Sequence, residues 1–225
     1  MEADFETHFR ELTNRLNHIA IVLFVFSVLG WFASELILQY IQSSLEVELH
    51  AVQVYEVIYA RLNIAVIFGL ALTLPVLCYQ LLLFAKPGLT SHEYTTLRNF
   101  LPLSLLLFTL GSVFAYVFVI STALNFLHAR TILAGINPIW GLGNTIGFIV
   151  RTSALTGILF QIPIFIAILN RLSIINREIL EKYRAYFIVF VLFVSALATP
   201  PDIITQILIT LPVILLYEIS LRLIK

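Results

Sequence analysis

The side chains that could bind a ligand in this sequence are polar groups near the ends of long apolar runs. Glu11 precedes the first apolar run, and Glu93 follows the second. Either carboxylate could bind a ligand, and each has an ordinary structural alternative. Glu11 can form an ion pair with Arg15 one helical turn later, and Glu93 can stabilise the first turn of a helix. These positions therefore suggest recognition of a charged group or local helix stabilisation.

A second set of polar residues lies within or between the apolar runs. Gln80 and Gln161 fall inside runs, and Gln206 lies near the start of the last one. A polar side chain in hydrocarbon needs a hydrogen-bonding partner, so each is a candidate functional position. The turn at 199–202 reads Thr199-Pro200-Pro201-Asp202, where Asp202 is typical of a helix N-cap.

Catalytic and metal-binding patterns are absent from the sequence. It contains no Walker A, HExxH or GxSxG motif, and its single cysteine, Cys78, excludes a multi-cysteine metal site. The histidines are scattered along the chain, at positions 8, 18, 50, 92 and 128. We therefore expect no enzyme activity, no metal and no cofactor.

The composition points to a membrane protein. Of 225 residues, 60% are hydrophobic and 12% are charged, and the mean hydropathy is +0.99. Soluble domains carry roughly 25% charged residues, so water cannot be the solvent for most of this surface. The formal net charge is zero, which gives no basic field for nucleic acid.

Six apolar runs predict an all-α, polytopic membrane protein with one domain over residues 1–225. The expected spans are 19–38, 62–84, 100–127, 146–169, 185–199 and 203–223. The first four are long enough to cross about 30 Å of hydrocarbon. The fifth is short, and it could be a re-entrant segment or a short span paired with the sixth. We favour the short pair, which would thin the bilayer locally.

The distribution of Lys and Arg predicts the sidedness. With the amino terminus inside, ten of the thirteen cations face the cytoplasm, and Arg61, Arg130 and Arg151 fall on or near the outside. This bias predicts that both termini are cytoplasmic. Residues 1–18 are acidic, unlike a cleavable signal peptide, and Leu12, Leu16 and Ile19 predict an amphipathic segment at the membrane surface.

Three prolines inside the runs, Pro75, Pro163 and Pro212, predict bent helices, which suit a concave surface. The Gly143-Gly147 pair at the start of the fourth run is a helix-packing motif of low specificity.

Taken in order, these segments resemble the TatC family of the twin-arginine translocase from about His8 to Glu218. The motifs that carry the resemblance are His8-x-x-Glu11-Leu12-x-x-Arg15-Leu16, Pro75-x-x-x-Tyr79-Gln80, Phe84-x-x-Pro87-Gly88-Leu89-x-x-x-Glu93, Phe108-x-x-Gly111-x-x-Phe114-x-Tyr116, Phe160-x-x-Pro163, Thr199-Pro200-Pro201-Asp202-x-x-x-Gln206, and Pro212 with Tyr217-Glu218.

The resemblance implies a glove-shaped receptor in the cell membrane that binds twin-arginine signal peptides at its cytoplasmic face. Glu11 and Glu93 would contact the arginines, since carboxylates accept guanidinium hydrogen bonds in pairs. Phe84 and Arg15 would belong to the same site. The turn from Thr199 to Gln206 would dock single-span TatA- or TatB-type subunits, several copies of the chain would share one complex, and the proton motive force would drive export.

The sequence departs from the family pattern at several positions. Thr13 stands where an arginine is usual, and Gln161 where many members have a glutamate. Asn63 replaces a usual lysine. These departures leave open a divergent paralogue with only an assembly role. A small secondary transporter or channel is a further alternative, although the two halves of the sequence show no convincing similarity.

Overall fold

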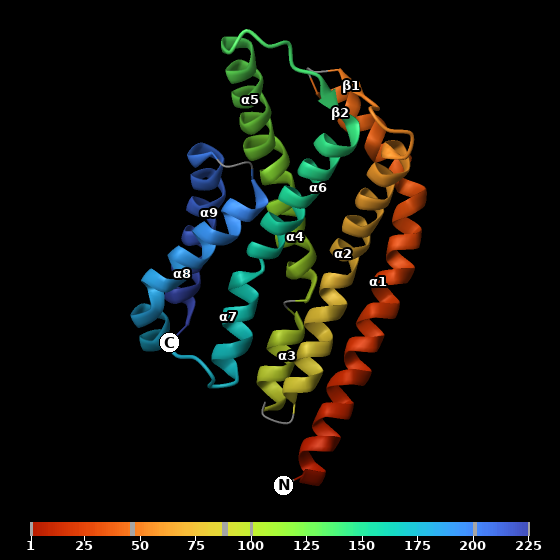
Figure 1. Ribbon diagram of the computed structural model, residues 1–225. Helices are drawn as coiled ribbons and strands as arrows, with labels where there is room; N and C mark the ends of the chain where they lie inside the picture. Colours follow the sequence, from red (N-terminus) through yellow and green to blue (C-terminus); the bar gives the residue numbers. More distant parts are fainter. Residues whose placement is uncertain (1, 46–47, 87–89, 100, 200–201, 225) are drawn as a thin grey trace.

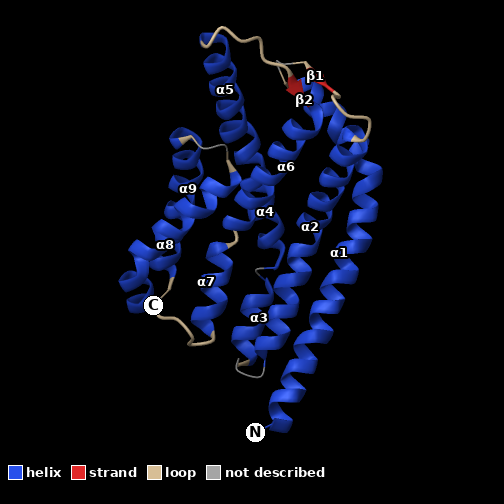
Figure 2. Ribbon diagram, in the orientation of Figure 1, coloured by secondary structure: helices blue, strands red, loops and turns tan. Residues whose placement is uncertain are grey.

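The computed structural model describes residues 2–45, 48–86, 90–99, 101–199 and 202–224, and nearly all of them are helical (Figures 1 and 2). The elements in chain order are α1 (Glu2–Ser44), β1 (Leu49–His50), α2 (Glu56–Ala85), α3 (Ser91–Asn99), α4 (Leu101–Phe114), the π-helix η2 (Ala115–Ile120), α5 (Ser121–Leu133), β2 (Trp140–Gly141), α6 (Leu142–Leu159), α7 (Ile162–Arg171), α8 (Arg177–Ala198) and α9 (Ile203–Leu223).

The helices form a bundle with two distinguishable ends. The amino terminus, α3 and the connection from α7 to α8 lie at the lower end in Figure 1, and β1 and β2 lie toward the opposite end. The long helices α1 and α2 run side by side. The sequence prediction of an all-α membrane bundle is confirmed by this arrangement.

The α1–α2 contact depends on small residues. A Cβ placed on Gly30 would lie only 2.7 Å from the carbonyl oxygen of Ala65, so glycine permits the close approach of the two backbones. Arg61 of α2 then reaches back to α1, where its Nε donates to Ser34 Oγ at 3.1 Å and its guanidinium lies 4.6 Å from the Trp31 ring centre. These contacts fix α2, which carries several of the candidate site residues.

Five stretches are long and apolar enough to cross a membrane: Thr13–Ser44, Glu56–Phe84, Leu101–Leu133, Leu142–Arg171 and Ile203–Leu223. Helix α8 is not among them, because charged residues occupy its first two turns. Its uncharged part, 185–198, rises about 21 Å at 1.5 Å per residue. Helix α8 itself has 22 residues, longer than the sequence suggested, but its uncharged part is short as expected, and it packs against α9.

The amino-terminal segment is helical as expected, but it is not a separate helix. Helix α1 continues from Glu2 to Ser44. The sequence from 12 to 19 contains no glycine or proline that would end a helix, so the segment and the first span join. Residues Asn14, Leu16 and His18 are exposed along this stretch.

Of the three prolines expected to bend helices, Pro163 coincides with a break. Its ring conflicts with the carbonyl four residues earlier, and α6 ends at that residue, Leu159. Helix α7 then starts at Ile162. Pro75 and Pro212 lie inside the continuous helices α2 and α9.

The two connections that carry β1 and β2 contain a contact that the sequence did not reveal. Strands β1 and β2 pair in parallel, with Leu49 opposite Trp140. Glu56, at the first turn of α2, is only 7% exposed, and its Oε2 accepts hydrogen bonds from the backbone N–H groups of Val52 and Gly143, both at 3.2 Å. The carboxylate therefore joins the loop before α2 to the start of α6.

Replacing Glu56 with alanine should lower the stability of this end of the bundle. The buried N–H of Gly143 and the partly buried bond from the N–H of Val52 would lose their acceptor, at a cost of about 1–3 kcal/mol. We expect a lower unfolding temperature of the detergent-solubilised protein for Glu56→Ala. Glu48→Ala is the matched control, because Glu48 is exposed and lies in the same loop. An equal effect of both substitutions would contradict the role of Glu56.

Candidate functional site

The lower ends of α1 and α2 are joined by two of the candidate residues. Arg15 Nη1 donates to Gln80 Oε1 at 3.1 Å, and both side chains are partly buried. The sequence placed Arg15 in a binding site and Gln80 at membrane depth, without linking them. Phe84 lies one turn beyond Gln80 on α2, on the same side of the helix, and is 41% exposed. An arginine, an amide and an exposed aromatic ring are thus gathered at one end of the helix pair.

Helix α3 packs beside this end of α2. Lys86 Nζ lies 5.3 Å from the centre of the Tyr94 ring. This cation–π contact joins the end of α2 to the first turn of α3. Glu93 is the residue before Tyr94, and Glu11 lies one turn before Arg15 in α1. The helices that carry the two carboxylates, α1 and α3, therefore both pack against α2 at the same end of the bundle. The Glu11 and Glu93 side chains themselves lie outside the described part of the structure.

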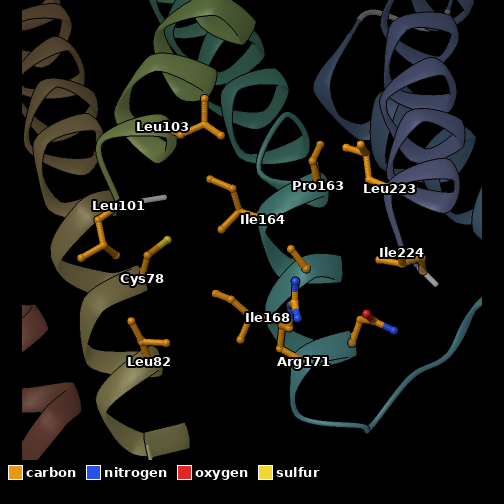
Figure 3. A pocket seen from close by; sticks show the side chains of 12 residues that line it. Cys78, Leu82, Leu101, Leu103, Pro163, Ile164, Ile168, Arg171, Leu223 and Ile224 are labelled. Carbon is orange, nitrogen blue, oxygen red and sulfur yellow. The ribbon is translucent and has the colours of Figure 1, made fainter. Parts of the chain in front are cut away.

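A cavity of about 530 Å³ opens next to these helices (Figure 3). Its walls are largely apolar: Cys78 and Leu82 of α2 face Ile164 and Ile168 of α7 across it, and Leu223 and Ile224 close the far side. Arg171 is a charged residue of the lining. Such a cavity can receive apolar groups from a bound chain.

Gln161 occupies the break between α6 and α7 and is fully buried. Its Nε2 donates to the backbone carbonyl of Ser104 at 2.9 Å and approaches that of Gly157 at 3.5 Å. Its Oε1 has no hydrogen-bonding partner among the described residues. Since the near neighbours are carbonyl oxygens, a donor is required here. The side chain links the α6–α7 break to α4.

The turn between α8 and α9 contains the N-cap that the sequence predicted. Asp202 is the N-cap of α9, and its Oδ1 accepts from the backbone N–H of Thr205 at 2.8 Å. Thr199 is buried and donates to the carbonyl of Ser195 at 3.0 Å. Pro200 and Pro201, the middle of the predicted docking turn, lie outside the described residues. The two described ends of the turn are therefore occupied by hydrogen bonds within the chain.

Gln206 is one of a group of polar side chains between α6, α8 and α9 that sequence reasoning largely missed. We call this group, Thr152, Ser195, Gln206 and Thr210, the polar seam. Gln206 Nε2 donates to the carbonyl of Leu192 at 2.8 Å, from α9 to α8. Ser195 and Thr210 are hydrogen-bonded at 3.1 Å, and Thr152 of α6 donates to the carbonyl of Ala198 at 2.8 Å. The only sequence signal was small polar residues in apolar runs, which are common in membrane helices.

Because the seam turns inward, the opposite faces of these helices are apolar and exposed. The residues more than half exposed on α8 and α9 include Tyr186, Val189, Phe190, Phe193, Leu197, Ile203 and Leu211. At the other end of the pair, Tyr217 donates to the carbonyl of Leu180 at 2.8 Å and stacks on Phe187, with ring centres 4.0 Å apart. Arg184 and Glu218 form an ion pair at 2.7 Å. Helices α8 and α9 are thus held together by contacts at both ends of the pair.

Comparison with known proteins gives a consistent result. The family model of the Sec-independent protein translocase protein TatC matches residues 7–212. The TatCy protein of Bacillus subtilis is 32% identical over 97% of this chain and 87% of its own length. The TatC protein of Aquifex aeolicus is 34% identical over 95% of this chain and 91% of its own length.

Solved structures agree with the sequence relatives. A crystal structure of the twin-arginine translocase receptor TatC in DDM superposes with a TM-score of 0.85 at 33% identity, covering 97% of this chain and 99% of that one. A second crystal structure of this receptor gives a TM-score of 0.79 at 32% identity. This chain, a multi-pass membrane protein, therefore belongs to the TatC family of Sec-independent protein translocase proteins.

Proposed function

We propose that this chain is the subunit of a twin-arginine translocase that binds the signal peptides of folded export substrates at the cytoplasmic face. The observation that supports this most is the meeting of α1, α2 and α3 at one end of the bundle. There the Arg15–Gln80 hydrogen bond and the Lys86–Tyr94 contact hold the helices that carry Glu11 and Glu93. Exposed Phe84 adds an apolar surface beside them.

The orientation belongs to the same proposal. With six spans, counting the short α8, both termini lie in the cytoplasm and the paired strands lie outside. The thirteen cations favour this sidedness, since ten of them then fall on the inner side. The apolar cavity between α2 and α7 would accommodate the hydrophobic part of a peptide whose arginines lie near α3. A chain of this kind resides in the cell membrane and works with the proton motive force.

The transporter or channel alternative receives no support from the polar residues at depth. In a transporter or channel, the polar residues at depth would lie close together near the middle of the bilayer. Here Gln80 bonds to Arg15 at one end, Gln161 bonds to the Ser104 backbone, and Gln206 bonds to the Leu192 backbone. Each glutamine side chain is hydrogen-bonded to a different partner, so the three do not line a common pathway for a transported solute.

Peptide binding tests the proposed function directly. The purified protein in lipid nanodiscs is titrated with a fluorescent twin-arginine signal peptide and with the same peptide carrying two lysines. We expect clearly tighter binding of the arginine peptide, because guanidinium groups pair bidentately with carboxylates and ammonium groups do not. Equal affinity for both peptides would overturn the proposal.

We also propose that the turn of Thr199, Pro200, Pro201 and Asp202, with Gln206, docks single-span partner subunits together with the exposed apolar face of α8 and α9. The described hydrogen bonds of this turn stay within the chain, so the partner contacts would be made by apolar side chains such as Phe193 and Leu197. The lipid bilayer would cover what the partner leaves free, and further copies of the chain would join the complex.

A photo-crosslinking amino acid tests this docking face. At Phe193 it should capture a co-expressed single-span subunit in membranes, because this ring is 63% exposed on α8. Phe24 of α1 is the matched control, since it is 70% exposed on a helix at the opposite side of the bundle from α8 and α9. We expect several-fold more crosslinked product from position 193. Equal yields at both positions would argue against docking at α8.

A further inference from the structure

Arg151 lies within a candidate membrane span, and no carboxylate among the described residues forms an ion pair with it. Arg151 is on α6, nine residues after its first residue, and its side chain is exposed. Among the described residues, no acidic side chain lies within ion-pair distance of it, and its Nε donates to the backbone carbonyl of Gly147 at 3.1 Å. An exposed and unpaired cation in a hydrocarbon span is costly, which makes it a candidate binding group.

The direction of this hydrogen bond places the charge near the membrane surface. Gly147 is one turn closer to the start of α6, so the Arg151 side chain runs toward the end that carries the paired strands. Gly147 lies beside the Tyr59 ring, since a Cβ on Gly147 would be 4.0 Å from that ring. The hydrogen bond from Arg151 to the Gly147 carbonyl is therefore at the level of Tyr59. Tyr55 and Tyr59 are exposed at the start of α2, as aromatic residues at a membrane interface commonly are.

Below this level a groove runs between α2 and α6. The α2–α6 groove has a volume of about 420 Å³, and its lining includes Tyr59, Asn63, Val66, Leu70, Arg151 and Leu155. Its polar residues, Tyr59, Asn63 and Arg151, lie toward the interface. Val66, Leu70 and Leu155 lie deeper by sequence position. The groove therefore offers a cation and hydrogen-bonding groups above an apolar channel.

The size of the groove argues against a protein helix as its occupant. A helix about 10 Å across takes up roughly 420 Å³ for each turn of 5.4 Å, so the groove would hold a single turn. An acyl chain is far thinner and can follow it. A phosphate fits the polar end, since an arginine and an amide both donate hydrogen bonds to phosphate oxygens.

We propose that the α2–α6 groove binds a phospholipid, with its phosphodiester on Arg151 and Asn63 and one acyl chain along Val66, Leu70 and Leu155. A phospholipid whose headgroup alcohol is uncharged, such as glycerol, is favoured over one whose headgroup carries an ammonium group. Among the described residues no carboxylate forms an ion pair with Arg151, and none lines the groove to receive an ammonium group. On the orientation proposed above, this lipid belongs to the outer leaflet. The site is separate from the peptide-binding end of the bundle.

A photoactivatable phosphatidylglycerol with a diazirine on its acyl chain tests the proposal. The protein is placed in phosphatidylcholine nanodiscs that contain this probe, irradiated, and analysed by peptide mass spectrometry. We expect labelling within 62–70 and 150–155, with about tenfold less in Arg151→Gln, the change expected from one charge-assisted hydrogen bond. Arg130→Gln is the control, because Arg130 is exposed on α5 and should leave the labelling unchanged.

A second variant keeps the test decisive if Arg151→Gln does not fold. Val66→Trp leaves every charge in place but fills the groove, since Val66 is half exposed within it. It should remove the labelling. The proposal is overturned if either folded variant is labelled like the unchanged protein, or if a phosphatidylcholine probe labels the groove equally. Capture of a partner subunit by a crosslinker at Leu70, with loss of lipid labelling, would also overturn it in favour of a protein ligand.

Discussion

Glu93→Ala should weaken binding of a twin-arginine peptide by about 30-fold or more, while the protein stays inserted and folded. Removing one partner of a desolvated charge pair costs about 2–5 kcal/mol. Glu93 is the third residue of α3, and the neighbouring Tyr94 holds this turn against Lys86, the residue that follows α2. The backbone position is therefore set by contacts that alanine at 93 leaves in place. Fluorescence titration in nanodiscs measures the loss.

The competing role of Glu93, stabilising the first turn of α3, makes different predictions. If the carboxylate only favours the helix N-terminus, its loss costs about 0.3–1 kcal/mol of helix stability and affects all peptides equally. A binding role requires that the twin-lysine peptide lose much less affinity than the twin-arginine peptide. Glu178→Ala is the matched control, because Glu178 also lies in the first turn of a helix, α8. Equal effects at 93 and 178 would refute the binding role.

Much of the architecture could be predicted because it depends on composition and on local rules. Apolar runs of 20 or more residues predict spanning helices, and five described stretches, in α1, α2, α4–α5, α6–α7 and α9, are long and apolar enough to cross a membrane. Asp202 after two prolines predicts an N-cap, and the structure places its carboxylate on the Thr205 N–H. Pro163 predicts a bend, and α6 ends four residues before it. Each of these depends on neighbours within one or two helical turns.

The long-range contacts could not be predicted from spacing. Nothing in the sequence pairs Arg15 with Gln80, which lie 65 positions apart, or Glu56 with Gly143, which lie 87 positions apart. The parallel pairing of Leu49 with Trp140 joins two loops of mixed composition. The polar seam of Thr152, Ser195 and Thr210 was also hidden, since single serines and threonines occur throughout membrane helices. These contacts require knowledge of which helix faces meet.

Gln161→Glu should destabilise the protein at neutral pH, by about 2–3 kcal/mol. The amide nitrogen of Gln161 faces the carbonyl oxygens of Ser104 and Gly157, at 2.9 and 3.5 Å, in a site with no solvent exposure. An ionised carboxylate would place negative charge against two acceptors. A protonated carboxyl could still donate one hydrogen bond, so the deficit should shrink as the pH is lowered. Thermal unfolding of the detergent-solubilised protein at several pH values measures this.

Gln161→Leu is the matched control, and it separates charge from packing. Leucine has a similar size, cannot ionise, and gives up one hydrogen bond to a backbone carbonyl, which costs about 1 kcal/mol at any pH. A larger, pH-dependent loss in Gln161→Glu than in Gln161→Leu would establish that the α6–α7 break needs a neutral donor toward α4. If Gln161→Glu is as stable as the unchanged protein at neutral pH, the site tolerates a charge. Gln161 would then be a substitute for the carboxylate of many family members rather than a structural link.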